Sequence, residues 1–182
     1  MSYRYEIRLS GEGGQGLVLA GKILAEAAAI YDGKNATQSQ SYGPEARGGA
    51  SRSEVIISDE DIDYPKAMHI DLLLALTQES CNKYVKDLKP EGILLVDSDA
   101  VTECPSGKFK IYRVPIIESA RSKIGRVVVA NMVALGIIVE LTKIVSMEGI
   151  ESAILARVPK GTEKINMQAF QLGVEMAKTL MA

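Results

Sequence analysis

The glycine-rich segment at residues 11–16, GEGGQG, constrains the fold more than any other stretch of this chain. The preceding segment, residues 3–9, alternates apolar and polar residues as a strand does, with Tyr3, Tyr5, Ile7 and Leu9 on one face. The following segment, residues 17–28, is rich in helix formers and has apolar residues at helical spacing. Residues 11–16, the glycine turn, are therefore expected to join a strand to a helix. There a backbone without side chains can turn tightly and approach an anion.

The glycine turn matches the dinucleotide fingerprint G-x-G-x-x-G in the context that this motif requires. The next part of a dinucleotide site is an acidic residue at the end of the second strand. The expected second strand, residues 35–41, has no carboxylate, and Asp32 belongs to the turn before it. An ordinary NAD site is therefore disfavoured. Two interpretations stay open: a turn that approaches a phosphate, and a turn that only packs the first helix on the sheet. The candidate contact residues are Gly11, Gly13, Gly14, Gln15 and Gly16.

Length and composition favour a single domain over residues 1–182. Hydrophobic residues make up 47% of the chain and charged residues 24%, an ordinary balance for a globular protein. The net charge of -2, without a basic stripe, argues against a nucleic-acid partner. The most apolar stretch, residues 127–141, contains Asn131 and Glu140 and is too short to span a membrane. The first ten residues lack the apolar core of a signal peptide, so we expect a cytoplasmic protein.

Residue counts exclude several chemistries. His69 is the single histidine, and its place just before an apolar strand predicts a solvent-facing position at a strand end. The two cysteines, Cys81 and Cys104, stand apart in the sequence, as reduced thiols do in a cytoplasm. Two cysteines cannot build a four-cysteine iron–sulfur cluster or zinc site within one chain. The sequence also lacks a G-x-x-x-x-G-K-S/T phosphate loop. We therefore expect no metal site, no catalytic residue and no redox cofactor held by this chain alone.

Apolar runs alternate with helical patterns through the rest of the chain. Residues 68–76 form a nearly continuous apolar run, which is typical of a strand buried on both faces. Residues 128–145 are expected to form the longest helix. The other expected strands are 35–41, 51–57, 93–96 and 108–114, and the other expected helices are 79–88, 115–124, 147–155 and 165–180. This order predicts a three-layer α/β/α Rossmann-like sandwich whose mostly parallel sheet carries an antiparallel arm.

The second informative stretch is the segment 41–51. Gly-Pro and Gly-Gly pairs on either side of Glu45 and Arg47 indicate a loop, and polar residues at 37–41 and 51–53 flank it. One interpretation is a solvated hairpin tip. The other is a surface that docks on a partner protein or a polar ligand, with Arg47 placed for a carboxylate or a phosphate. We favour docking because this loop and the glycine turn are both expected at strand ends. The candidate contact residues here are Tyr42, Glu45 and Arg47.

Several motifs occur in order along nearly the whole chain. They are GEGGQG at 11–16, AGKIL at 20–24, YGPEARGG at 42–49, SDEDI at 58–62, DLLLAL at 71–76 and ANMVALG at 130–136. Together they resemble the gamma subunit of 2-oxoacid:acceptor (ferredoxin) oxidoreductases. The extended form YGPEARGGASRS, at 42–53, is most similar to the 2-oxoglutarate branch. The pyruvate, branched-chain and indolepyruvate branches share part of the pattern and stay open.

The resemblance implies a part of an enzyme of anaerobic metabolism. Complexes of this family convert a 2-oxoacid and coenzyme A to an acyl-CoA, carbon dioxide and reduced ferredoxin. Thiamine diphosphate and iron–sulfur clusters serve that chemistry, and the resemblance implies that other subunits hold them. It also implies alpha, beta and in some complexes delta subunits as partners, ferredoxin as acceptor, and a homodimer when the chain is isolated. In this setting Tyr42, Glu45 and Arg47 would contact a partner subunit or coenzyme A.

A second class of function competes with the subunit interpretation. The chain could be a stand-alone nucleotide-binding regulatory domain of Rossmann-like fold, which needs no other subunit. Such a binder should retain a nucleotide or melt at a higher temperature when one is added, whereas a subunit should co-purify with larger chains. The agreement of several independent motifs favours the subunit over a function inferred from one glycine fingerprint.

Overall fold

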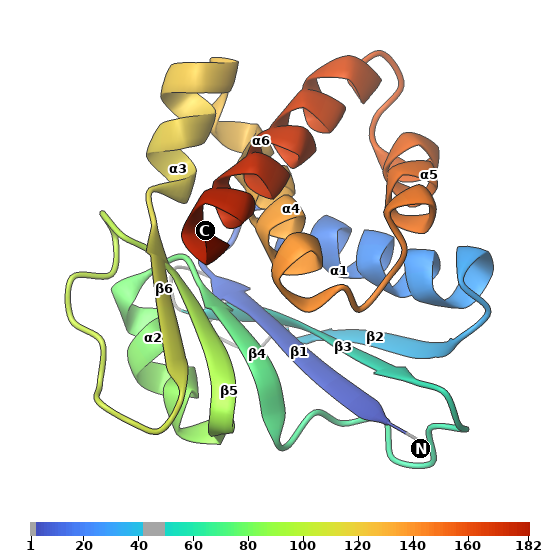
Figure 1. Cartoon of the computed structure of the whole chain (residues 1–182), viewed down its shortest axis with the longest axis vertical. Coiled ribbons are helices and arrows are strands. Elements are labelled where there is room, and N and C mark those ends of the chain that lie inside the picture. The colour runs from blue at the N-terminus through green and yellow to red at the C-terminus, as the bar shows by residue number, and fades with distance from the viewer. Residues whose placement is uncertain (1–2, 42–49) are drawn as a thin grey trace.

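The computed structural model describes residues 3–41 and 50–182 (Figure 1). A six-stranded sheet with the order β2-β3-β1-β4-β5-β6 forms its centre. The neighbouring pairs β1–β4, β4–β5 and β5–β6 are parallel, whereas β3 is antiparallel to both β1 and β2. The predicted mostly parallel sheet with an antiparallel arm is therefore confirmed, and the arm is the pair β2–β3. The strands are β1 (Arg4–Gly11), β2 (Asn35–Ser41), β3 (Ser51–Ser58), β4 (Ile70–Ala75), β5 (Leu88–Asp97) and β6 (Lys110–Val114).

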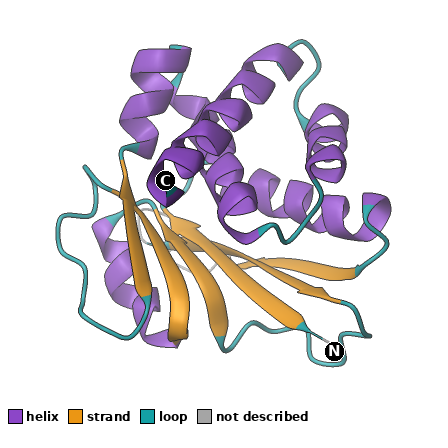
Figure 2. Ribbon diagram, viewed as in Figure 1, coloured by secondary structure: helices purple, strands orange, loops and turns teal. Residues whose placement is uncertain are grey.

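Helices cover the two faces of the sheet unequally (Figure 2). Helices α1, α4, α5 and α6 lie over one face, and α3 lies beyond the end of β6 on the same side (Figure 1). Helix α2 lies on the opposite face. The α/β/α sandwich is thus confirmed, with one thick and one thin helical layer. The helices are α1 (Leu17–Glu26), α2 (Gln78–Tyr84), α3 (Ile116–Ser119), α4 (Ala130–Thr142), α5 (Met147–Arg157) and α6 (Glu163–Met181).

The sheet divides the hydrophobic core into two clusters. Leu72 and Leu74 of β4 face the cluster under α1, α4 and α6, whereas Leu73 and Ala75 face the cluster under α2. All four side chains are buried. The continuous apolar run at 68–76 thus reflects a strand covered on both faces, as predicted, because successive side chains of a strand point to opposite faces.

Helix α4 is shorter than expected. It begins at Ala130, after a 3₁₀ turn at Val127–Val129, and it ends at Thr142 because Lys143 adopts a left-handed conformation with φ 53°. The prediction that residues 128–145 form the longest helix is wrong: in the described part of the chain α6, with 19 residues, is longer than α4, with 13. Residues 130–140 are all buried, which explains why every one of them except Asn131 and Glu140 is apolar or glycine.

Helices α4 and α6 meet backbone to backbone at two glycines. A Cβ at Gly136 would lie 2.1 Å from the carbonyl oxygen of Phe170. A Cβ at Gly173 would lie 2.0 Å from the carbonyl oxygen of Val133. Both distances are far below van der Waals contact, so any side chain here would force the helices apart. This close crossing holds α6 against the buried helix α4.

The face of β1 that meets α2 carries charged residues, which the alternating pattern did not predict to be buried. Arg8 is 3% exposed; its guanidinium lies 2.7 Å from the Glu54 carboxylate and 2.6 Å from the Asp87 carboxylate. It also lies 5.1 Å from the centre of the Tyr84 ring and donates a hydrogen bond to the carbonyl of Ala67. Buried charges are tolerated when they are paired and hydrogen-bonded. Arg8 therefore ties β1 to β3 and to the end of α2.

Strand β5 begins earlier than predicted. The expected helix 79–88 ends at Tyr84 and is followed by a 3₁₀ turn, Val85–Asp87. The strand then includes Leu88, which was expected to end that helix, and residues 89–92, which were expected to separate it from the strand 93–96. Its pairing with β4 shifts register between Ile70 and Leu72. The Pro and Gly in this stretch are accommodated at that irregularity, as is usual for such residues in strands.

Candidate functional site

The glycine turn connects β1 to α1, as predicted. Strand β1 ends at Gly11, and α1 begins at Leu17 with Gly16 as its N-cap residue. Gly16 has φ 74° and ψ 24°, and Gly14 has φ 88°, so both occupy the left-handed region that favours glycine. The turn therefore depends on glycine at two positions for its backbone conformation.

Gln15 closes the glycine turn from within. Its side-chain oxygen accepts a hydrogen bond from the backbone N–H of Glu12, at 2.8 Å. A Cβ at Gly11 would lie 2.1 Å from the same oxygen, so the Gln15 side chain lies over Gly11. The oxygen of Gln15 thus stabilises the turn itself. For Gln15, this contact supports the interpretation in which the turn packs the first helix on the sheet and does not approach a phosphate.

Asn131 links the glycine turn to α4. This residue is 4% exposed, and its amide nitrogen donates to the carbonyl oxygen of Gly16 at 3.1 Å. Its amide oxygen accepts from the backbone N–H of Met132 at 2.9 Å. Sequence reasoning did not assign Asn131 to the site, although a polar residue inside the apolar stretch 127–141 was a usable signal. Asn131 fixes the N-terminal end of α1 against the N-terminal end of α4.

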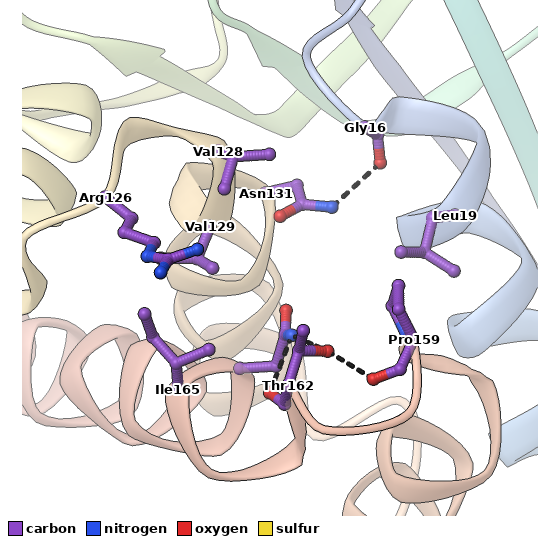
Figure 3. A pocket seen from close by; sticks show the side chains of 10 residues that line it. Gly16, Leu19, Arg126, Val128, Val129, Asn131, Pro159, Thr162 and Ile165 are labelled. Carbon is purple, nitrogen blue, oxygen red and sulfur yellow. Dashed lines mark hydrogen bonds between the residues drawn. The ribbon is translucent and has the colours of Figure 1, made fainter.

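A cavity of about 220 Å³ lies beside this contact (Figure 3). The N-terminal ends of α1, α4 and α6 each supply residues to its wall. Leu19 and Pro159 face Arg126 and Val129 across it (Figure 3). Its lining is Gly16, Leu19, Arg126, Val128, Val129, Asn131, Pro159, Thr162, Ile165 and Asn166. The cavity is apolar over most of its wall and carries one cationic side chain.

Two exposed valines extend this site over the surface. Val127 is 45% exposed and Val128 is 68% exposed, which is unusual for adjacent valines. Both line a second hollow of about 290 Å³, together with Gly14 and Gln15 of the glycine turn. Val128 also lines the first cavity. The glycine turn and the valine pair thus form one partly apolar surface.

The end of β2 and the start of β3 lie at the same end of the strands as the glycine turn. Gly11 at the end of β1 pairs with Ser51, and Ser41 pairs with Arg52. The flanks of the second informative stretch therefore lie beside the glycine turn, as expected. Tyr42, Glu45 and Arg47 themselves lie outside the described residues.

Asp32 and His69 hold structural positions. The Asp32 carboxylate accepts a hydrogen bond from the backbone N–H of Ser146 at 2.7 Å and one from the Ser146 hydroxyl. It therefore anchors the start of α5, as part of the turn before β2. His69 is exposed just before β4, and its backbone N–H donates to the Glu6 carboxylate at 3.0 Å. The strand-end position expected for His69 is confirmed.

Within residues 3–41 and 50–182, no group of three or more His, Cys, Asp or Glu side chains could hold a metal ion. Over the same ranges, no helix combines the length and apolar character needed to cross a bilayer.

Gly16→Ala is expected to lower the free energy of unfolding by about 2 kcal/mol, because alanine is strained at positive φ and its Cβ would lie 2.4 Å from the Asn131 amide nitrogen. Gly14→Ala is the matched control. It carries the same strain, but nothing lies within 4 Å of its added Cβ, so we expect a loss of about 1 kcal/mol. Urea unfolding of both variants measures the difference. Equal losses would show that the contact with Asn131 does not constrain Gly16.

Comparison with known proteins identifies the family. The model of the pyruvate ferredoxin/flavodoxin oxidoreductase family matches residues 6–176. The 2-oxoglutarate synthase subunit KorC of Methanocaldococcus jannaschii is 54% identical over 179 residues, covering 97% of this chain and 96% of that protein. The pyruvate synthase subunit PorC of the same organism is 33% identical over 159 residues, covering 82% of this chain and 84% of that protein.

A solved structure agrees with the sequence comparisons. The gamma subunit of a keto/oxoacid ferredoxin oxidoreductase from Geobacter sulfurreducens has a TM-score of 0.88 and 58% identity, over 96% of this chain and 99% of that chain. The 2-oxoglutarate:ferredoxin oxidoreductase of Magnetococcus marinus has a TM-score of 0.84 at 24% identity, over 97% of this chain and 31% of that chain, and shares the fold. The chain therefore belongs to the pyruvate ferredoxin/flavodoxin oxidoreductase family.

Proposed function

We propose that this chain is the gamma subunit of a 2-oxoglutarate:ferredoxin oxidoreductase. The complex would convert 2-oxoglutarate and coenzyme A to succinyl-CoA and carbon dioxide, with reduction of ferredoxin. One observation carries the choice of branch: within a single organism, the chain is 54% identical to a 2-oxoglutarate synthase subunit and 33% identical to a pyruvate synthase subunit. Identity to both over most of the chain supports a role in assembly that the branches share.

The chain's own part in this complex is structural. Iron–sulfur clusters need more cysteines than the two present here, and the Gly-Asp-Gly start of the usual thiamine motif is missing. The residues of this chain do not fit either group, so in our proposal thiamine diphosphate and the clusters are held by alpha, beta and, where present, delta subunits. Coenzyme A would be held mainly by those subunits as well, and the chain would work in the cytoplasm as one unit of residues 1–182.

The surface that meets these subunits is, in this proposal, the glycine turn with Val127 and Val128. Contiguous exposed apolar surface is typical of interaction sites, and the valine pair adjoins the hollow that Gly14 and Gln15 line. The glycine turn has a fixed shape because Gln15 closes it and Asn131 holds Gly16. A preformed surface loses little conformational entropy on binding, which favours stable assembly.

The purified chain alone is expected to show no 2-oxoglutarate-dependent dye reduction, even with thiamine diphosphate and coenzyme A added. Activity should appear when the chain is mixed anaerobically with the other subunits of its complex.

Val128→Asp is expected to bind the other subunits at least tenfold more weakly, because a carboxylate buried in the interface is costly. The variant should still fold, because Val128 is exposed in the isolated chain. Lys178→Ala, an exposed change on α6, is the control.

Turnover by the isolated chain, free of other subunits, would contradict the proposal. Normal assembly of Val128→Asp would show that the valine pair lies outside the interface. Retention of a nucleotide by the isolated chain, together with normal activity of a complex lacking it, would favour the stand-alone binding domain instead.

Arg47 is proposed to contact a carboxylate of a partner subunit or a phosphate of coenzyme A. The proposal rests on its residue type and on the Gly-Pro and Gly-Gly pairs around it. Arg47→Ala should cost about 1.5–3 kcal/mol, or about ten- to a hundredfold in affinity, and leave the isolated fold stable. Assembly assays and a coenzyme A titration measure the two alternatives. Unchanged results in both would favour an exposed pair with Glu45, which contributes little.

A further inference from the structure

The two cysteines, which are distant in the sequence, share one hydrophobic cluster in the structure. Cys81 lies on α2 and is fully buried between this helix and the sheet. Cys104 lies in the connection between β5 and β6, is half-buried, and packs against the same cluster. The sequence predicts two separate reduced thiols. In the fold, both cysteines pack in the same hydrophobic cluster.

Gln78 ties the segment that carries Cys104 to the helix that carries Cys81. Its side-chain oxygen accepts hydrogen bonds from the backbone N–H groups of Thr102 and Glu103, at 2.9 and 3.0 Å. Its side-chain nitrogen donates to the carbonyl of Glu103 at 2.7 Å. The residue before Cys104 is thereby fixed to the first turn of α2, and Cys81 follows Gln78 by three residues on that helix. In this arrangement the Cys104 side chain lies close enough to Cys81 to help raise the pKa of its thiol.

The two sulfur atoms differ in their surroundings. Burial raises the pKa of the Cys81 thiol to about 11, with a further rise from Cys104 and an opposing effect from Arg113. Cys81 is therefore a neutral thiol near pH 7 and reacts slowly by itself. Cys104 is partly exposed and is the thiol that a reagent from solution reaches first.

We propose that Cys81 and Cys104 form a reversible redox pair that closes to a disulfide by exchange with a small oxidised disulfide, such as glutathione disulfide. The Cys104 thiolate attacks one sulfur of glutathione disulfide, and one glutathione leaves as its thiolate. The Cys81 thiolate then attacks the Cys104 sulfur, and the second glutathione leaves. The two protons of the cysteines end on the two glutathione molecules. The pair is oxidised by two electrons and glutathione disulfide is reduced by the same two.

The site suits a sensor rather than a permanent crosslink. Disulfides in a reducing compartment are usually transient and redox-sensing. Closure would join α2 covalently to the connection that follows β5. That connection leaves the sheet at Asp97, at the carboxyl end of β5, and so at the same end of the parallel strands as the glycine turn. Oxidation would therefore stiffen the sheet edge that carries the proposed assembly surface.

The test uses the chain of residues 1–182, reduced and then incubated with glutathione disulfide under nitrogen. Remaining thiols are trapped with iodoacetamide in denaturant, and mass spectrometry reads the products. We expect the wild-type chain to lose two hydrogens, to bind no iodoacetamide, and to recover both thiols with dithiothreitol. Cys81→Ser should stop with one glutathione on Cys104. Cys104→Ser should leave Cys81 as a free thiol, because no accessible thiol starts the exchange.

The rate of closure in the wild-type chain should rise steadily with pH between about 7 and 9, because the Cys81 thiolate is scarce below its pKa of about 11. Two free thiols after treatment would overturn the proposal. A wild-type chain that stops with glutathione on Cys104 would also overturn it, as would a disulfide that joins two chains.

Discussion

Arg8→Ala is expected to lower the free energy of unfolding by about 3 kcal/mol. The Arg8 guanidinium is buried between the carboxylates of Glu54 and Asp87, and its removal leaves Glu54, with an 11% exposed side chain, without its buried partner. Breaking a buried ion pair from one side typically costs about 3–5 kcal/mol. We expect the lower end because the Asp87 side chain is 33% exposed and water compensates it in part. Urea unfolding followed by circular dichroism measures the loss.

Arg121→Ala is the control for this change. Arg121 pairs with Glu118 on the surface, and both side chains are about half exposed. Exposed pairs of this kind contribute about 0–1 kcal/mol, so this variant should unfold almost as the wild type does. If Arg8→Ala also lowered the free energy of unfolding by less than about 1 kcal/mol, other groups would compensate the carboxylates of Glu54 and Asp87.

Gly173→Ala is expected to lower the free energy of unfolding by about 3 kcal/mol or more. Helix propensity alone predicts the opposite sign, since alanine favours a helix by about 1 kcal/mol over glycine. The contact with α4 decides the outcome, because the new Cβ would lie 2.0 Å from the carbonyl oxygen of Val133. A carbonyl of a buried helix cannot move away as a flexible side chain can, so the two helices must separate. Thermal and urea unfolding both measure this effect.

Glu175→Ala is the control on the exposed side of α6. Its side chain is 68% exposed and pairs only weakly with Lys178, at 3.4 Å, so we expect a change within about 0.5 kcal/mol. If the Gly173→Ala variant were more stable than the wild type, α4 and α6 could separate without lowering the free energy of unfolding. The close crossing would then not be what holds α6 in place.

Local sequence patterns predicted the strand–turn–helix at residues 11–16 and the strand buried on both faces near residues 70–76. These features depend on neighbours in the chain, namely glycine for the turn and unbroken apolar residues for the strand. The order of elements then predicted the mixed sheet correctly. Element boundaries were less accurate, because the end of α4 at Lys143 and the early start of β5 depend on packing.

Contacts between distant residues were beyond prediction from one sequence. Asn131 reaches Gly16 across 115 residues, and Arg8 reaches Asp87 across 79. Asn131 interrupts an apolar stretch, whereas Arg8 follows the alternation that signals an exposed face. The interruption at Asn131 could be seen in the sequence, but the partner of neither residue could, since partners are set by the crossing of elements. The Cys81–Cys104 pair was missed for the same reason.

The outer strands of the sheet also bear on how the chain behaves before it finds its partners. β2 and β6 are the outermost strands, and their sequences are NATQSQS and KIYRV. An outer strand that is long, flat and apolar invites strands of other molecules to add to it and so promotes aggregation. Lys110 and Arg113 place charge on β6 and make such addition unfavourable at that edge, and β2 has no apolar residue besides Ala36. The charges of β6 thus disfavour self-association of a newly made chain along that edge, which suits a chain whose proposed assembly surface, the glycine turn with the valine pair, lies elsewhere.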